Sequence, residues 1–149
     1  MLPSPTHVET HGVAPAALSA GAALPIATRR TITDFDNVAV SQLAMNTHPL
    51  HTDYLHARAT RFGRPLVVSP FLLSCLCALV VNELEVAAIG ALEIRELAFE
   101  RPVHPGDTIG AQASVVDVHA HGATFEVIGV KDGGERFARF LLALDWEHA

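Results

Sequence analysis

The stretch that decides the fold is an almost wholly apolar segment, Ser69-Pro70-Phe71-Leu72-Leu73-Ser74-Cys75-Leu76-Cys77-Ala78-Leu79-Val80-Val81. Ser69 followed by Pro70 is typical of a helix N-cap and a first helical position, so the sequence predicts a helix from Pro70 to about Val81. A helix that is apolar on nearly every face must be enclosed by the protein rather than laid on its surface. The segment is too short to span a bilayer, which needs about 20 apolar residues.

A polar run that is rich in turn-forming residues precedes this helix. It reads Asn46-Thr47-His48-Pro49-Leu50-His51-Thr52-Asp53, and further on Thr60-Arg61-Phe62-Gly63-Arg64-Pro65. His48 stands before Pro49, and a residue before proline is pushed out of the helical region. The helix that precedes this run is therefore expected to end before Pro49. Polar groups gathered directly ahead of a buried helix predict a reactive site at the edge of the core.

Two further helices are expected on the amino-terminal side of the buried one. Thr33 can cap a helix that runs to about Ala44, and Asp34 and Asp36 then sit near the positive end of its dipole. The expected inward side chains of this helix are Phe35, Val38, Val40, Leu43 and Ala44. A second short helix is expected over residues 52–60, with Tyr54, Leu55 and Ala59 turned inward.

The remaining segments read mostly as strands, because β-branched and aromatic residues recur between turns of Gly, Pro and Asp. A short strand is expected over residues 25–33, and four longer ones over Ala87–Phe99, Thr108–His119, Ala123–Val130 and Arg136–Trp146. Helices followed by antiparallel strands predict an α+β domain, with a curved antiparallel sheet wrapped around one buried apolar helix. We expect one domain over residues 25–149, preceded by a flexible tail, residues 1–24, that is disordered or draped over the surface.

Composition narrows the classes of partner. The chain has 149 residues and a net charge of −6, and its nine Arg and single Lys are scattered, so nucleic acid is not an expected partner. Residues 1–24 contain no Lys or Arg and therefore lack the basic start of a secretory signal. Cys75 and Cys77 are interpreted as small buried hydrophobes in a reducing compartment. These features predict a cytoplasmic protein with no membrane partner.

Three motifs together resemble the MaoC-like hydratases and dehydratases, which are related to (R)-specific enoyl-CoA hydratases. They are the run over residues 46–53, then Phe62-Gly63-Arg64-Pro65-Leu66-Val67, and then Phe99-Glu100-Arg101-Pro102-Val103-His104-Pro105-Gly106-Asp107-Thr108. The resemblance extends from about Thr31 to Leu144. It implies a hotdog fold, a homodimer or higher homo-oligomer, and a thioester ligand on coenzyme A or a carrier protein. Coenzyme A would belong to the substrate, and no separate cofactor or metal is implied.

The resemblance also implies a reaction, the reversible addition of water across a 2,3-double bond conjugated to the thioester. In the family motif an Asp stands five residues before a His, and the two hold the water. Here His51 matches the His, but Asn46 occupies the Asp position. The Asn form of the motif resembles members that act on branched, dicarboxylic acyl-CoAs of the mesaconyl- or β-methylmalyl-CoA type. A second departure is Val68-Ser69, where many relatives have His-Gly.

The chemistry of hydration suggests a role for each candidate residue. His51 is the acid/base candidate because an imidazole titrates near pH 6.5, Asn46 can orient the water, and the amide of Ser69 can polarise the thioester oxygen. The expected substrate-binding residues are Arg61, Arg64, Val68, Pro70 and Asp53. Asp53 can instead cap the following helix, and a metal site from His48, His51 and His56 lacks a carboxylate or Cys to complete it.

Two alternatives to hydration stay open at this point. A non-catalytic acyl-CoA-binding protein would follow if Asn46 in place of Asp marks a lost activity. A hotdog thioesterase would need a carboxylate or nucleophile near the thioester carbonyl, and Glu83 and Glu85 are the nearest acids in the sequence.

Overall fold

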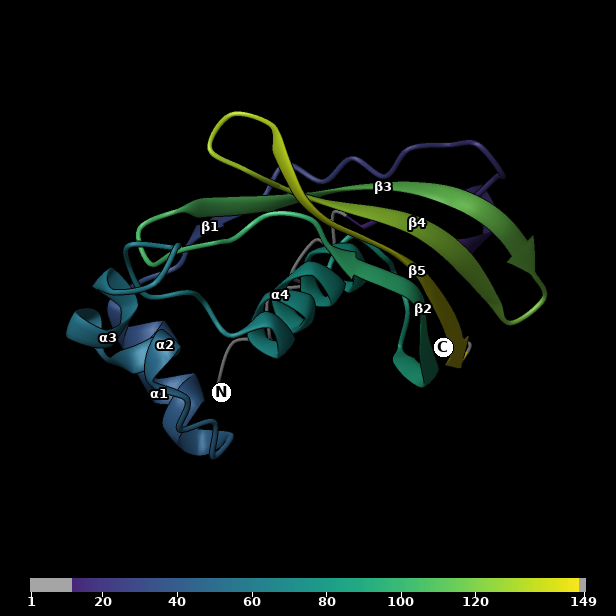
Figure 1. Cartoon of the computed structure of the whole chain (residues 1–149). Helices are drawn as coiled ribbons and strands as arrows, with labels where there is room; N and C mark the ends of the chain where they lie inside the picture. The colour runs from purple at the N-terminus through teal and green to yellow at the C-terminus, as the bar shows by residue number, and fades with distance from the viewer. Residues whose placement is uncertain (1–11, 148–149) are drawn as a thin grey trace, which may run out of the picture.

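Five antiparallel strands form one sheet, in the order β1-β3-β4-β5-β2, in the computed structural model, which describes residues 12–147. The strands are β1 (Arg29–Thr31), β2 (Ala88–Phe99), β3 (Thr108–His119), β4 (Gly122–Lys131) and β5 (Glu135–Glu147). The sheet curves over helix α4 (Ser69–Val81), which lies against its concave face (Figure 1). The α+β class and the curved sheet around one apolar helix are thereby confirmed.

Helix α4 is buried on one face, whereas its sequence predicts burial on nearly every face, because the sheet covers only one side of it (Figure 1). Ser74 and Ala78 are exposed, and Cys75 and Cys77, which the sequence predicts to be buried, are half-buried. Leu72, Leu76 and Val80 are buried and pack in one core with Phe125 and Phe137 of the sheet. The start of the helix differs from the prediction by one residue. The carbonyl of Val68 accepts hydrogen bonds from the N–H groups of Phe71 and Leu72, at 3.0 and 3.2 Å. Val68 is therefore the N-cap, and Ser69 is the first helical residue rather than the cap.

Three short helices gather beyond one end of the sheet, beside the first turn of α4 (Figure 1). They are α1 (Asp34–Leu43), α2 (Pro49–Thr52) and α3 (Tyr54–Arg58). The predicted cap of α1 is confirmed, because Thr33 Oγ1 accepts from Asp36 N–H and Asp36 Oδ2 accepts from Thr33 N–H. The helix expected over residues 52–60 is shorter than predicted, since α3 covers residues 54–58 and is capped by Asp53, and the one-turn helix α2 before it was not predicted.

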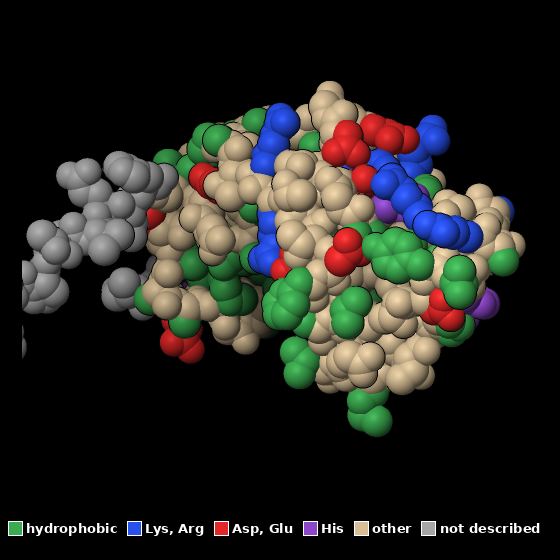
Figure 2. All heavy atoms as spheres, turned by 90° about the vertical axis from the view of Figure 1, so that its left-hand side faces the viewer, with side chains coloured by type: hydrophobic (Ala, Val, Ile, Leu, Met, Phe, Trp, Pro, Cys, Tyr) green, Lys and Arg blue, Asp and Glu red, His purple; other side chains and the backbone are tan. Residues whose placement is uncertain are grey.

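The predicted inward faces of these helices are wrong. Phe35 and Leu43 are 80% and 85% exposed, whereas Asn37 and Ser41 are the buried residues of α1. In α3, Tyr54 and Leu55 are exposed and Ala57 is buried. The physical reason is that α1 packs against polar backbone groups, so its amide side chain faces inward. Figure 2 views the molecule from this end and shows separate apolar side chains on the surface.

The amino-terminal segment, as far as it is described, lies along β3. Leu24 N–H donates to Ala113 O at 2.9 Å, and Val115 N–H donates to Ala22 O at 2.8 Å. Leu24 is buried, so residues 12–24 follow the draped alternative, and residues 1–11 lie outside the described part of the chain. No helix within residues 12–147 has the length and apolar character needed to cross a membrane.

Candidate active site

His51 lies in the one-turn helix α2, where its ring is oriented by a backbone carbonyl. Its Nδ1 is 2.9 Å from Leu66 O. A carbonyl oxygen can only accept, so Nδ1 carries the hydrogen and the neutral ring keeps its lone pair on Nε2. The ring is partly buried. This arrangement leaves Nε2 as the ring atom that can take a proton from a bound molecule.

The carbonyls of residues 65 and 66 are held by two histidines. His104 is buried, and its Nδ1 is 2.8 Å from Pro65 O, directly before the Leu66 carbonyl that His51 uses. Val67 N–H donates to Val103 O at 2.8 Å, which ties the same segment to the turn that leads into β3. The loop that enters α4 is therefore fixed on both sides.

A buried ion pair anchors this turn. Lys131 Nζ is 3.1 Å from Asp107 Oδ2 and 2.9 Å from Pro102 O, and both charged side chains are less than a tenth exposed. Burial alone would raise the pKa of Asp107. The N–H of His104 and the ammonium of Lys131 outweigh burial and hold that pKa below the usual carboxyl value. This cluster was not predicted from the sequence, although Lys131 is the single Lys of the chain and Asp107 lies in a Pro-Gly-Asp turn.

Asn37 of α1 is a further polar residue that sequence reasoning missed. It is 1% exposed, and its side-chain amide bonds to His51 O, Leu66 O and Val68 N–H, at 2.9, 3.0 and 3.0 Å. The sequence signal for Asn37 is its spacing from Ser41, because two polar residues four positions apart lie on the same face of a helix. The apolar residues of α1 concealed that face.

Ser69 lines a cavity of about 240 Å³ beside the first turn of α4. The N–H of Val68 is taken by Asn37, and Pro70 has no N–H. Among the residues that the structure describes, the Ser69 N–H has no acceptor. The positive end of the α4 dipole and one unengaged N–H therefore lie at Ser69, a residue that lines the cavity.

Two arginines line the same cavity and differ in their surroundings. Arg101 pairs with Glu135 at 3.2 Å, whereas Arg61 stacks on Phe62, with 4.7 Å from its Cζ to the ring centroid. Within residues 12–147, Arg61 has no carboxylate partner. Arg64, the other predicted substrate ligand, does not line the cavity and lies 3.4 Å from Asp107 Oδ1.

The other predicted site residues take local structural positions. Asp53 caps α3 through Oδ1, which accepts from the N–H groups of Leu55 and His56. Asn46 follows α1, and its Oδ1 is 3.4 Å from His48 N–H. Val68 is buried with its N–H engaged, and Pro70 is exposed without lining the cavity.

His51 and Asn46 are not among the residues that line the 240 Å³ cavity. In the described part of the chain no hydrogen bond joins Asn46 to His51. The structure therefore brings Ser69 and Arg61 to one cavity, and it connects His51 to that cavity through Leu66, a lining residue whose carbonyl holds the ring.

Three histidines stand close together at this end of the molecule. The ring centroid of His48 is 6.1 Å from that of His51 and 6.1 Å from that of His56. His48 Nδ1 accepts from Leu50 N–H at 3.2 Å, so this nitrogen is engaged within its own turn. Across residues 12–147 no three His, Cys, Asp or Glu side chains form a group that would hold a metal ion.

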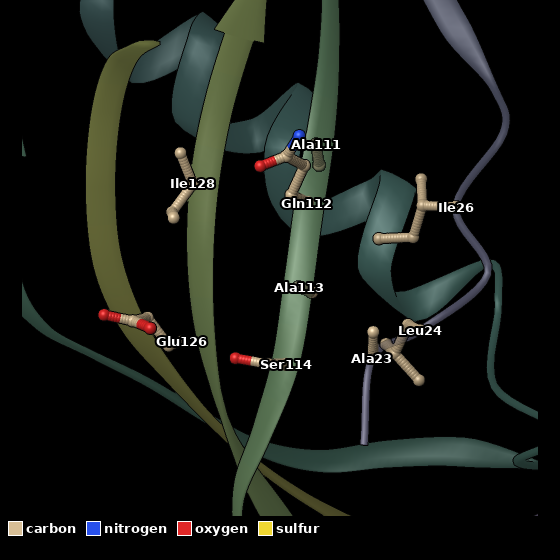
Figure 3. A pocket seen from close by; sticks show the side chains of 9 residues that line it. All are labelled: Ala23, Leu24, Ile26, Ala111, Gln112, Ala113, Ser114, Glu126 and Ile128. Carbon is tan, nitrogen blue, oxygen red and sulfur yellow. The ribbon is translucent and has the colours of Figure 1, made fainter. Parts of the chain in front are cut away.

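A second hollow, of about 350 Å³, lies between the amino-terminal segment and β3 (Figure 3). Gln112, Ser114, Glu126 and Ile128 project into it. Their neighbours along the strands belong to the core around α4, so strand alternation places these four on the opposite face of the sheet. None of the predicted site residues lines this hollow.

The comparisons with known proteins agree with this architecture. The structure is similar to a monoamine oxidase regulatory protein from Archaeoglobus, with 27% identity, a TM-score of 0.77, and 93% of this chain and 97% of that chain covered. It is also similar to an R-hydratase from Pseudomonas aeruginosa, with 18% identity, a TM-score of 0.79, and 91% and 86% covered.

An (R)-hydratase from A. caviae gives 22% identity and a TM-score of 0.69, with 88% of this chain and 98% of that chain covered. These neighbours confirm the hotdog fold. A comparison with curated proteins finds no match to the sequence. The family model described as MaoC like domain matches residues 16–133, which is most of the chain. The chain belongs to the MaoC-like domain family.

Proposed function

We propose that the protein is an acyl-thioester hydratase/dehydratase, which adds water to, or removes it from, a 2-enoyl-CoA. The observation that carries the proposal is the hydrogen bond from His51 Nδ1 to Leu66 O, because it leaves Nε2 as a free base. The same segment leads into Ser69, whose N–H is open at the start of α4. The proposed base is thus hydrogen-bonded to the loop that leads into the proposed oxyanion donor.

In the hydration direction, His51 Nε2 takes a proton from water while the water oxygen forms a bond to C3 of the substrate. The electrons of the 2,3-double bond move toward the thioester oxygen, which the Ser69 N–H stabilises. The proton then passes from the imidazolium to C2, and the product is a 3-hydroxyacyl thioester. Asn46 is proposed to orient the water through its side-chain amide, since it cannot itself act as a carboxylate base.

The function is tested by hydration of a panel of 2-enoyl-CoAs, including crotonyl- and mesaconyl-CoA, followed by loss of the conjugated thioester absorbance. Wild type and Asn46→Asp are run side by side. We expect the wild type to hydrate at least one branched or dicarboxylic substrate, which would assign Asn46 to specificity. Activity gained only in Asn46→Asp would contradict the proposal for the natural protein.

A non-catalytic acyl-CoA-binding protein is the second candidate function. It is favoured by one observation, the bond from His48 N–H to Asn46 Oδ1, which engages Asn46 in its own turn rather than with His51. Tight binding of acyl-CoA without turnover would identify it. A thioesterase is disfavoured, because Glu83 and Glu85 follow the carboxyl end of the 13-residue helix α4, about 20 Å from Ser69.

Arg61 is proposed to bind an anionic part of the substrate, either a phosphate of coenzyme A or an acyl carboxylate. It lines the cavity and has no carboxylate partner among the described residues. Arg61→Ala is expected to raise KM about tenfold with little change in kcat, because the contact is made equally in the ground and transition states. Arg58→Ala, an exposed arginine of α3 outside the cavity, is the control and should leave KM unchanged. An equal KM for both variants would refute the assignment.

We also propose that the chain forms a homodimer and lies in the cytoplasm. Strand β2 is an edge strand that exposes Leu92, Leu97 and Phe99, and a second copy of the chain is the proposed cover for this edge. A sedimentation mass equal to one chain would contradict a homodimer. Cys75 and Cys77 are free thiols, and burial raises the pKa of Cys77 to about 11. A cytoplasmic location stays a proposal from the sequence.

A further inference from the structure

One buried amide stands where the three segments of the candidate active site meet. Asn37 is 1% exposed, and the side chain crosses from α1 to α2 and to the loop before α4. Its Nδ2 donates to His51 O at 2.9 Å and to Leu66 O at 3.0 Å, and its Oδ1 accepts from Val68 N–H at 3.0 Å. A single side chain therefore contacts the backbone of all three segments.

The hydrogen-bond network fixes the orientation of this amide without ambiguity. Two of its neighbours are carbonyl oxygens, which only accept, and the third is a backbone N–H, which only donates. Asn37 alone among small side chains supplies two donors and one acceptor in this arrangement. Toward Leu66 and Val68 it pairs with C=O and N–H as a neighbouring β-strand would. No isosteric residue reproduces the pattern, since Asp lacks the donors and Leu lacks all three groups.

The contacts of Asn37 act directly on the environment of the His51 ring. Leu66 O accepts from both Asn37 Nδ2 and His51 Nδ1, so both of its lone pairs are used. The second donor of Asn37 holds the carbonyl of His51 itself. Asn37 therefore holds both the backbone of His51 and the Leu66 carbonyl that orients the His51 ring. The tautomer of the ring follows from this geometry.

The contact to Val68 acts on the other half of the site. Because Val68 N–H points to Asn37, the Ser69 N–H is the first unengaged amide of α4 in the described chain. The proposed base and the proposed oxyanion donor are thus both positioned by the side-chain amide of Asn37. A displacement of Asn37 would move His51 and the start of α4 relative to each other.

We propose that Asn37 is a positioning residue, which holds His51 in its Nδ1–H tautomer and keeps that ring in register with the Ser69 N–H. The catalytic part of this inference rests on the proposed hydratase function, whereas the effect of Asn37 on the His51 tautomer does not. Ser41 provides the matched control, because it is buried on the same face of α1 and its Oγ has no hydrogen-bond partner within the described residues.

The test begins with the ¹⁵N shifts of the His51 ring in wild type, Asn37→Asp, Asn37→Ala and Ser41→Ala. The neutral ring of the wild type should show a protonated Nδ1 and an unprotonated Nε2. In both Asn37 variants the equilibrium should move toward the Nε2–H tautomer, whereas Ser41→Ala should match the wild type. A wild-type ring with its hydrogen on Nε2, or Asn37 variants that match Ser41→Ala, would overturn the proposal. The wild-type spectrum tests it even if an Asn37 variant does not fold.

The second arm is kinetic. In both Asn37 variants kcat for hydration should fall by up to about 100-fold, the cost of a misplacement of about 1 Å at the reacting groups, while KM stays near the wild-type value. Ser41→Ala should keep both constants. A variant in which only KM rises would contradict a positioning role. If wild type hydrates no enoyl-CoA, the proposed function fails, and the ring spectra still decide whether Asn37 sets the tautomer.

Discussion

His51→Ala is expected to lower the hydration rate of a 2-enoyl-CoA by about 10²- to 10⁴-fold, the range that a positioned general acid/base contributes. In the structure His51 Nδ1 donates a hydrogen bond to Leu66 O, which leaves Nε2 as the base. Alanine removes the base and the acid of the reverse step together. The measurement is kcat for hydration, followed by loss of the conjugated thioester absorbance.

His56→Ala is the matched control for this substitution. His56 lies in α3, is exposed, and has its ring near that of His48 rather than at Leu66. Its backbone N–H bond to Asp53 is unaffected by the change. The control should keep its activity close to that of wild type. Full activity in His51→Ala would rule out the assignment of the base.

Lys131→Met is expected to lower the free energy of unfolding by about 3–5 kcal/mol at neutral pH, because it leaves the buried carboxylate of Asp107 without its nearest cation. Lys131 Nζ contacts both Asp107 Oδ2 and Pro102 O, and Met has a similar length but no charge. Urea-induced unfolding measures the change. Arg101→Met is the control, since the pair of Arg101 with Glu135 is 62% and 48% exposed and should contribute less than about 1 kcal/mol.

The pH dependence of this stability follows from the lowered pKa of Asp107. A carboxyl whose pKa is lower in the folded state stabilises the protein above its ordinary value of about 3.9. That contribution is lost as the pH falls through the folded-state pKa. In Lys131→Met the N–H of His104 and the guanidinium of Arg64 still contact Asp107, so the destabilisation should be full at neutral pH and shrink only as the pH falls below about 3.9. A loss that is as large at pH 3 as at pH 7 would contradict this account.

The strands and the buried helix could be predicted from the sequence because their patterns depend on local residue type. The expected strand over Thr108–His119 has the observed bounds, and the other three long strands differ by one residue at one or both ends. The cap of α1 by Thr33 was also predictable, since a capping box requires only residues three apart. The short strand within residues 25–33 was predicted too long, because only Arg29–Thr31 pair with β3.

The inward face of α1 could not be predicted in the same way. Apolar periodicity assumes that a helix packs on an apolar partner, whereas α1 packs through Asn37 on the backbone around Leu66 and His51. Only the three-dimensional arrangement shows that these carbonyls need a donor. The α4 cap lies at Val68 rather than at Ser69, because Val68 has an extended backbone and its carbonyl accepts the first helical hydrogen bonds.

The candidate site was predictable only where a residue acts through its own chemical type. His51 was predicted because it matches the His of the family motif and an imidazole is a candidate base, whereas its partner at Leu66 is a backbone group that no motif encodes. His104 and Lys131 were missed because their roles arise from burial between distant segments. Arg61 and Arg64 looked equivalent in sequence, but Arg64 is paired with Asp107 and Arg61 lines the cavity.

The most direct test of the hydratase proposal is the mass of the acyl-CoA that remains after wild-type protein is incubated with a 2-enoyl-CoA to equilibrium. The account predicts an acyl thioester that is heavier by one water, with the bond to coenzyme A intact and no free thiol. An unchanged substrate across the panel would contradict catalysis, and release of free coenzyme A would identify a thioesterase instead.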